Sequence, residues 1–179
     1  HAGTASEHGL RAARLAAKGF TARGDSLECD QGFASSQSDH LNTDAALGEP
    51  PQGWHLRNNL FKYHAACYGT HAAIEATGRL CAQHRLSASD VRRVVVRAPA
   101  SSDGVCNIAT PRTGLEAKFS LRHTVAMALA GIDTADMASY SDSATNDPAL
   151  ARLRERVHVE LVRECSAMTQ AEVEIETVA

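Results

Sequence analysis

Imidazole and thiol side chains gather in the segment FKYHAACYGTHAAIEA, which spans residues 61–76. His64, Cys67 and His71 lie here, at the entrance to an apolar helical pattern. The start of a helix presents unpaired N–H groups and a partial positive charge, so a carboxylate substrate could bind there. Imidazole and thiol groups beside it could move protons at neutral pH. We therefore predict that this segment forms one wall of an anion-binding site with acid–base chemistry.

A second group of cationic and proton-carrying side chains lies near the start of a later predicted helix, at Lys118, Arg122 and His123. Cys67, His71 and His64 could instead have purely structural roles. Cys67 could be a small buried hydrophobic residue, because free cysteine is among the most buried residue types. His71 could cap or fill its helix, and His64 could point to solvent.

Several motifs with known chemistry are absent from the sequence. It has no G-x-x-x-x-G-K-[ST], no G-x-G-x-x-G after a strand, no H-E-x-x-H and no G-x-S-x-G. A metal site at His64, Cys67 and His71 is the weakest alternative. His71 could reach Cys67 across one helical turn, but no carboxylate or second cysteine completes a recognised ligand spacing. We therefore expect no bound metal.

The bulk composition is that of a soluble globular protein. Of the 179 residues, 44% are hydrophobic and 22% are charged, which suits one medium domain, or one small domain with a piece of another. Lys and Arg form no cluster and 4% of residues are aromatic, so we expect no nucleic-acid partner. No apolar run approaches the ~18 residues that a membrane span requires. The five cysteines form no C-x-x-C pair, which indicates reduced thiols in a cytoplasmic protein.

The first 50 residues are predicted to be a helical segment and connector that belong to a larger body. A helix is expected over residues 6–19, with Ser6 as its N-cap and Gly19 as its stop signal. A short helix within 26–36 and a loop at DAALGEPPQG, residues 44–53, are expected to follow. The chain begins at His1 without methionine, directly at the entry to a helix, as a cut piece of a larger protein would.

Residues 51–179 are predicted to form an α+β domain. Alternating or β-branched runs predict about four strands, at residues 59–64, 91–98, 157–163 and 171–178. Apolar residues at helical spacing predict two main helices and two short ones, at residues 71–84, 116–131, 133–140 and 147–156. The expected fold is a small antiparallel sheet with helices packed on one face.

Three segments, in order, resemble the MmgE/PrpD family, whose members include 2-methylcitrate dehydratase, cis-aconitate decarboxylase and iminodisuccinate epimerase. FKYHAACYGTHAAIEA is similar to the family's lysine-tyrosine-proline-cysteine-x-x-x-Thr-His segment. HAGTASEHGLRAARLAAKGFTA resembles its H-x-G-x-A-x-x-G-L-x-A-A-x-L-A-x-x-G-F-T run. GLEAKFSLRHTVAMALAG resembles its A-K-F-S-L-x-Y-x-V-A-x-A-L-x-x-G run. The terminal EVEIET is similar to the strand on which such proteins return from the small domain.

The resemblance implies a fold and an activity. Family members combine a large all-helical domain with a smaller α+β lid, and their active site lies in the cleft between the two. This chain would then be the end of the helical domain plus the lid. Members act on small di- and tricarboxylates without metal or organic cofactor, by removing a proton next to a carboxylate. A cytoplasmic, homodimeric hydro-lyase similar to 2-methylcitrate dehydratase is therefore expected, with isomerase or decarboxylase activity as variants.

The resemblance also assigns roles to single residues. Catalytic roles are expected for Cys67, His71, His123 and His1. His1 matches the family's motif histidine, and His123 stands where most members have tyrosine. A substrate-binding role is expected for Lys118, which lies in the family's A-K-F-S segment. The same role is expected for His64 and Arg122 from their residue types and positions, although Arg122 replaces a proline common in the family. The alternative to an enzyme is a non-catalytic lid or dimerisation module that binds a partner surface or an anion.

Overall fold

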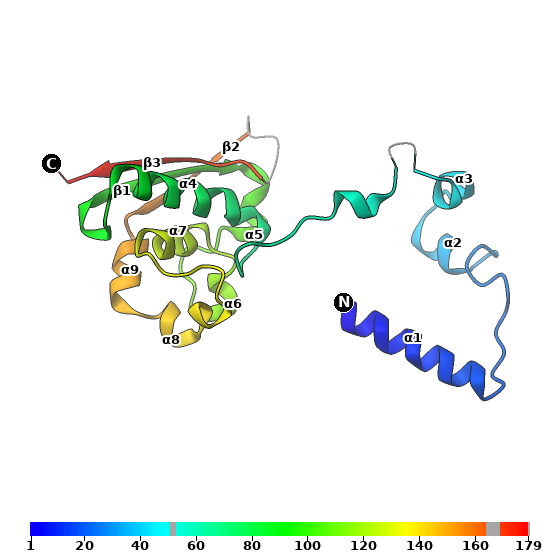
Figure 1. The fold of residues 1–179 in the computed structure, drawn as a ribbon. Helices are drawn as coiled ribbons and strands as arrows, with labels where there is room; N and C mark the ends of the chain where they lie inside the picture. Colours follow the sequence, from blue (N-terminus) through cyan, green and yellow to red (C-terminus); the bar gives the residue numbers. More distant parts are fainter. Residues whose placement is uncertain (51–52, 164–168, 179) are drawn as a thin grey trace. The chain divides into compact units, whose positions relative to one another are not determined.

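The computed structural model describes residues 1–50, 53–163 and 169–178 (Figure 1). These residues form two compact units, His1–Asn59 and Leu60–Ala179, and each is described by itself. The domain boundary predicted between residues 50 and 51 falls beside two residues, 51 and 52, that lie outside the described ranges. No helix in the described ranges is both long and apolar enough to cross a membrane.

The first unit consists of one 16-residue helix and several short ones, joined by irregular chain. Its elements are α1 (Ala2–Ala17), α2 (Phe33–Gln37), α3 (Thr43–Leu47) and the 3-10 helix η1 (His55–Asn58). The predicted start of the first helix was wrong, because α1 begins four residues before Ser6, whose hydroxyl donates to the carbonyl of Ala2 inside the helix. The loop predicted at 44–53 overlaps α3, which forms because the Asn42 side chain accepts a hydrogen bond from the N–H of Ala45.

The second unit is built on a three-stranded sheet in the order β2-β1-β3. The central strand β1 (Val91–Pro99) pairs in parallel with β2 (Val157–Val162) and antiparallel with β3 (Glu172–Thr177). The α+β class is confirmed, but the purely antiparallel pairing was wrong. The chain between β1 and β2 passes through several helices before it returns, and such a crossover delivers a parallel strand.

The strand predicted at 59–64 does not form, so the described sheet has three strands rather than four. Residues 59–62 carry no regular secondary structure, and the side chains of Phe61 and Tyr63 are exposed. The N–H of Ala65, just beyond this segment, donates to the carbonyl of Thr134 at 2.9 Å. The segment is therefore anchored to a loop of the second unit and not to the sheet.

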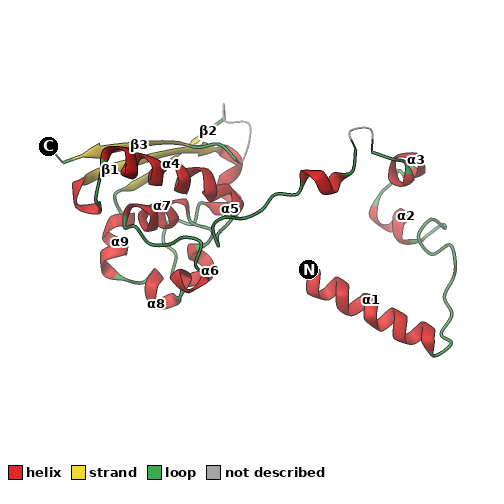
Figure 2. Ribbon diagram, in the orientation of Figure 1, coloured by secondary structure: helices red, strands yellow, loops and turns green. Residues whose placement is uncertain are grey.

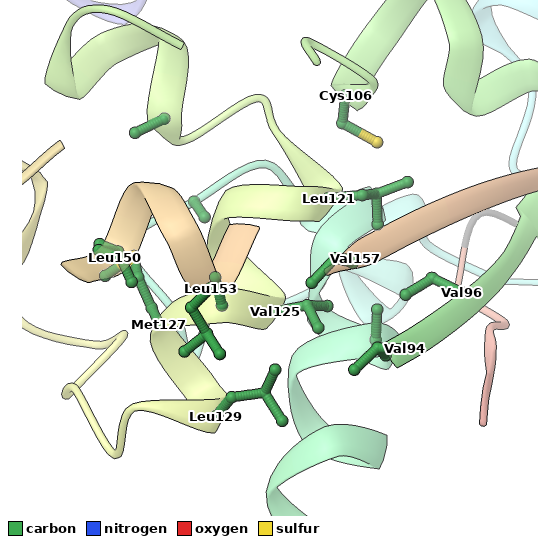
Figure 3. Packing of buried hydrophobic residues seen from close by; sticks show 14 of the residues in the cluster. Val94, Val96, Cys106, Leu121, Val125, Met127, Leu129, Leu150, Leu153 and Val157 are labelled. Atoms are coloured by element: carbon green, nitrogen blue, oxygen red, sulfur yellow. The ribbon is translucent and has the colours of Figure 1, made fainter. Parts of the chain in front are cut away.

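Helices cover one face of the sheet, as predicted (Figure 2). The two main helices are α4 (Tyr68–His84), which contacts β3, and α7 (Leu121–Leu129), which contacts β2. Shorter helices complete the layer: α5 (Asp103–Cys106), α6 (Gly114–Ala117), α8 (Asp142–Thr145), α9 (Pro148–Arg154), η2 (Ala88–Asp90), η3 (Ala100–Ser102) and η4 (Met137–Tyr140). Apolar side chains of the sheet and the helices form one core, which Figure 3 shows around Val94, Leu121, Val125, Leu153 and Val157.

The opposite face of the sheet is polar. Arg97 of the central strand forms ion pairs with three carboxylates on the two flanking strands. The distances from its guanidinium are 3.0 Å to Glu160, 3.1 Å to Glu172 and 3.2 Å to Glu174. The alternation of polar and apolar residues that predicted β2 and β3 therefore separates a core face from a charged face.

The helix predicted over 116–131 is divided into α6 and α7 by a break at residues 118–120. The Ser120 hydroxyl accepts a hydrogen bond from the N–H of His123 and caps α7. At the same break, the carbonyl of Lys118 accepts from the N–H of Cys67 at 2.8 Å, and Ser120 forms a β-bridge with Asn107. The break thus joins the start of α7 to the start of α4.

Candidate functional site

His71 lies in the first turns of α4 and is buried, with 8% of its surface exposed. Its ring packs against Tyr68, with 4.9 Å between ring centroids. Its Nε2 atom has no hydrogen-bond partner among the described residues. Burial lowers the pKa of His71 below its usual value, and the charges of His64 and Lys62 lower it further. The imidazole is therefore neutral at pH 7, with one nitrogen unused.

His64 stands edge-on to this ring, with 4.8 Å between the two centroids and 75° between the ring planes. Its Nε2 atom lies 3.1 Å from Oε1 of Glu75, one turn further along α4 than His71. Its Nδ1 atom lies 2.7 Å from the hydroxyl of Thr134. The Thr134 carbonyl in turn accepts hydrogen bonds from the Ala65 N–H and from the Tyr140 hydroxyl. Both ring nitrogens of His64 are thus occupied by neighbouring side chains.

The two histidines line the same pocket, on the side of α4 that faces solvent and the chain just before β3. Its walls include the aromatic, charged and small residues Tyr63, His64, Tyr68, His71, Glu75, Arg79 and Ala171. Its volume is about 660 Å³, which is enough for a small acid with several carboxylates. Arg79 reaches the Glu75 carboxylate only at 3.9 Å and its side chain is largely exposed. The pocket therefore offers two imidazoles, two phenols and one pair of opposite charges, Glu75 and Arg79.

Cys67 is the N-cap residue of α4 and is buried among the core side chains. It is not among the residues that line the pocket. Its neighbour is Cys106, whose pKa is raised to about 11 by burial and by Cys67 itself. The four cysteines of the described residues are free thiols, and Cys165 lies outside those residues. The position of Cys67 matches a small buried hydrophobic residue, and a catalytic role for it stays a prediction.

Lys118 and Arg122 lie near the break between α6 and α7, away from the residues that line the pocket. The Lys118 ammonium lies 3.4 Å from the sulfur of Met137 and 5.4 Å from the ring centroid of Tyr140. The Arg122 guanidinium donates to the side-chain oxygen of Asn107 at 2.6 Å, and burial lowers the pKa of Arg122. Both cations are half-buried, and their predicted contact with substrate stays a prediction.

His123 lies inside the core, with 0% of its surface exposed. Its Nδ1 atom is 3.3 Å from the guanidinium of Arg154 on α9, and its Nε2 atom has no partner within the described ranges. Burial lowers the pKa of His123 to about 4, and the charge of Arg154 acts in the same direction. His1 lies in the first unit, where it precedes α1 and is exposed.

Of the predicted site residues, the structure brings His64 and His71 together in one pocket. Two partners of these histidines were missed by sequence reasoning. Glu75 lies four residues after His71 on the same helix, and this spacing could have identified it. Thr134 is 70 residues from His64 in the chain, and no local pattern marks it. The described residues hold no group of three or more His, Cys, Asp or Glu side chains placed to bind a metal ion.

Comparison with known protein families agrees with the resemblance seen in the sequence. Residues 64–179 match the MmgE/PrpD C-terminal domain. No curated protein matches the chain. The matched range begins at His64 and includes every strand and every helix from α4 to α9. Because the match covers more than half of the sequence, this chain belongs to the MmgE/PrpD family.

Proposed function

We propose that this chain supplies one wall of a proton-transfer site in an enzyme that acts on small di- or tricarboxylates. The reaction would be abstraction of a proton next to a carboxylate, without metal or organic cofactor, as in a hydro-lyase similar to 2-methylcitrate dehydratase. The observation that carries the proposal is the unpartnered Nε2 atom of a buried, neutral His71 at the wall of a polar pocket. A general base requires a free nitrogen and an unprotonated ring at working pH.

The tautomer of His71 follows from its surroundings. The backbone of Ala66 and of His64 acts to raise the pKa of His71, which favours a proton on the ring nitrogen that faces them. Since Nε2 has no partner within the described ranges, that nitrogen is Nδ1. Nε2 then carries the unused lone pair of the ring, and substrate must reach this buried atom for it to take a proton from carbon. The resulting carbanion would expel a β-hydroxyl group, which leaves as water after taking up a proton, or be reprotonated on its other face. In a decarboxylation, loss of CO2 would itself leave the electron pair on carbon, and that carbon would then take up the proton.

Substrate carboxylates require cations near this base. Arg79 lies on the pocket wall, and Lys62 is close enough for its charge to lower the pKa of His71. Lys118 is proposed, from the family resemblance, to bind a substrate carboxylate, and Arg122 is proposed to do so as a second cation near the start of α7. Catalytic roles for Cys67, His123 and His1 rest on the same resemblance. We also propose that residues 1–50 belong to a larger helical domain.

A thermal-shift panel of citrate, methylcitrate, aconitate and aspartate-derived acids tests the proposal on this chain. We expect at least one acid to stabilise the chain and His71→Asn to abolish that shift. His84→Asn is the matched control, because His84 lies exposed at the end of the same helix. We expect it to preserve the shift. A shift that survives His71→Asn, or the absence of any shift over the whole panel, would contradict the proposal.

A second function is favoured by the first unit, which exposes large apolar side chains. Leu10, Phe20, Leu47 and Trp54 are each more than 60% exposed. Apolar surface of this kind marks interaction sites, so we propose that the first unit mediates formation of a homodimer. Sedimentation equilibrium would test it, with Leu10→Glu as the disrupting variant and the exposed Glu7→Gln as the control. If the wild-type chain sediments as a monomer, this proposal is contradicted.

A further inference from the structure

The two imidazoles in the pocket differ in how many of their ring nitrogens have a hydrogen-bond partner. His64 uses both ring nitrogens on side chains of the protein, at 3.1 Å to Glu75 and 2.7 Å to Thr134. His71 leaves one nitrogen without a partner among the residues described. The rings lie 4.8 Å apart in an edge-to-face arrangement. His64, with both ring nitrogens hydrogen-bonded, therefore supports His71, which has one nitrogen without a partner.

We propose that His64 is a positioning residue for His71 and that Glu75 and Thr134 fix it in one tautomer. The proposal replaces the direct substrate contact expected for His64. It rests on the proposed function for the chemistry that His71 performs, but the state of the His64 ring can be measured without any substrate. Glu75 and Thr134 thereby become functional residues of the same site.

The chemistry of the two partners dictates the tautomer. A carboxylate only accepts hydrogen bonds, so the His64 Nε2 atom facing Glu75 carries the proton. The Thr134 hydroxyl can donate, and in the neutral ring it donates to Nδ1. When His64 takes up a second proton, the same hydroxyl oxygen can accept from Nδ1–H. The two partners therefore accommodate both charge states without rotation of the ring.

A fixed ring at this distance influences its neighbour in two ways. The edge-to-face contact limits the rotamers of His71, and the Tyr68 ring packs against His71 at a centroid distance of 4.9 Å. A protonated His64 also opposes a second positive charge on His71, which favours the neutral, basic form. The orientation of the base is thus controlled through His64, and its charge is affected as well whenever His64 is protonated.

Other charged or titratable groups near the pair come from the segment before α4 and from α4 itself, namely Lys62, Tyr63, Tyr68, Glu75 and Arg79. Lys62 acts on His71 in the same direction as His64. The chain before β3 contributes Thr169, Gln170 and Ala171, which carry no charge. Asp133 is adjacent to Thr134 in sequence and exposed to solvent. The carboxylate in contact with the His64 ring is that of Glu75.

The test is long-range ¹H–¹⁵N correlation spectroscopy of the chain with ¹⁵N-labelled histidine. At pH 7.5 we expect His64 in the Nε2–H tautomer and His71 in the Nδ1–H tautomer. In Glu75→Gln the side-chain amide can donate to Nε2, so the His64 population shifts toward Nδ1–H. Arg79→Gln is the control, since Arg79 contacts Glu75 and not the ring, and it should leave the His64 tautomer unchanged.

A second arm measures transmission to His71. In His64→Gln we expect the titration midpoint of His71 to rise, because a neighbouring positive charge is removed. Wild-type His64 in the Nδ1–H tautomer, or an unchanged His71 midpoint in His64→Gln, would overturn the proposal. A missing response of His71 to added citrate would contradict the proposed function instead, and the tautomer result would still judge the positioning role.

Discussion

His71 and His123 look alike by burial and differ in what lies beside them. Each has an Nε2 atom without a partner in the described part of the chain, and burial is the main cause of the lowered pKa of each. His71 adjoins a pocket, whereas His123 lies in the core beside the Arg154 guanidinium. Burial and an unused nitrogen are therefore common to both histidines, and the pocket beside His71 is what distinguishes it.

The largest difference between the two histidines is expected in the stability lost when each is replaced by alanine. We expect His123→Ala to lower the free energy of unfolding by about 3 kcal/mol, because a fully buried side chain leaves a cavity. His71→Ala should cost about 1 kcal/mol, because the vacated space opens to the pocket and fills with water. Urea unfolding of both variants at pH 7 measures the difference. Equal losses would show that His71 is as much a part of the core as His123.

The second-largest effect is expected when acid protonates the core histidine, His123. The pKa of His123 is about 4 when folded, against an ordinary value of 6.5. The unfolded chain therefore binds a proton between these values that the folded chain does not, so stability is lost as pH falls from 6.5 toward 4. Between pH 7 and pH 4.5 this one group should cost about 2 kcal/mol.

His123→Tyr is the variant that isolates this effect, since tyrosine carries no charge over that range. We expect the variant to lose about 2 kcal/mol less stability than the wild type between pH 7 and pH 4.5. Urea midpoints at the two pH values give the comparison, and carboxylates common to both proteins cancel. His84→Tyr, at the exposed end of α4, is the control and should keep the wild-type pH dependence. If both variants behave alike, proton uptake at His123 is not the cause.

The sequence predicted the strands and helices that are determined by a local pattern of residues. All three strands were expected from alternating or β-branched runs, and α4 ends at the predicted residue. The break at 118–120 was not expected, because Lys118, Phe119 and Ser120 do not exclude a helix. Tertiary hydrogen bonds to Cys67 and Asn107 impose it. The parallel direction of β2 likewise depends on the path of the whole crossover, which no single segment encodes.

The candidate site was predictable to the same extent. His64 and His71 flank the start of one helix, so their proximity follows from spacing. Their separation from His123 does not, because it depends on which side of α7 faces α9. The role of Thr134 also depends on the loop that anchors Ala65. Residues near a helix end can thus be grouped from sequence, but contacts made across 70 positions cannot.

The smallest effect is expected at Glu75, and it sharpens the contrast between pocket and core. Its carboxylate is 52% exposed and pairs with His64 at 3.1 Å. Exposed ion pairs contribute little to stability, so Glu75→Gln should change the free energy of unfolding by no more than about 0.5 kcal/mol. Urea unfolding at pH 7 would measure it, with Glu7→Gln on the exposed face of α1 as the control.

A loss above about 2 kcal/mol in Glu75→Gln would mean that the His64 network holds the fold together, as core contacts do. The pocket would then be a structural feature, and the positioning role would lose its basis. A small loss of stability combined with a changed His64 tautomer would instead support the positioning role. Polar contacts around His71 would then be maintained at little gain in stability, which is expected where side chains are arranged for chemistry rather than for packing.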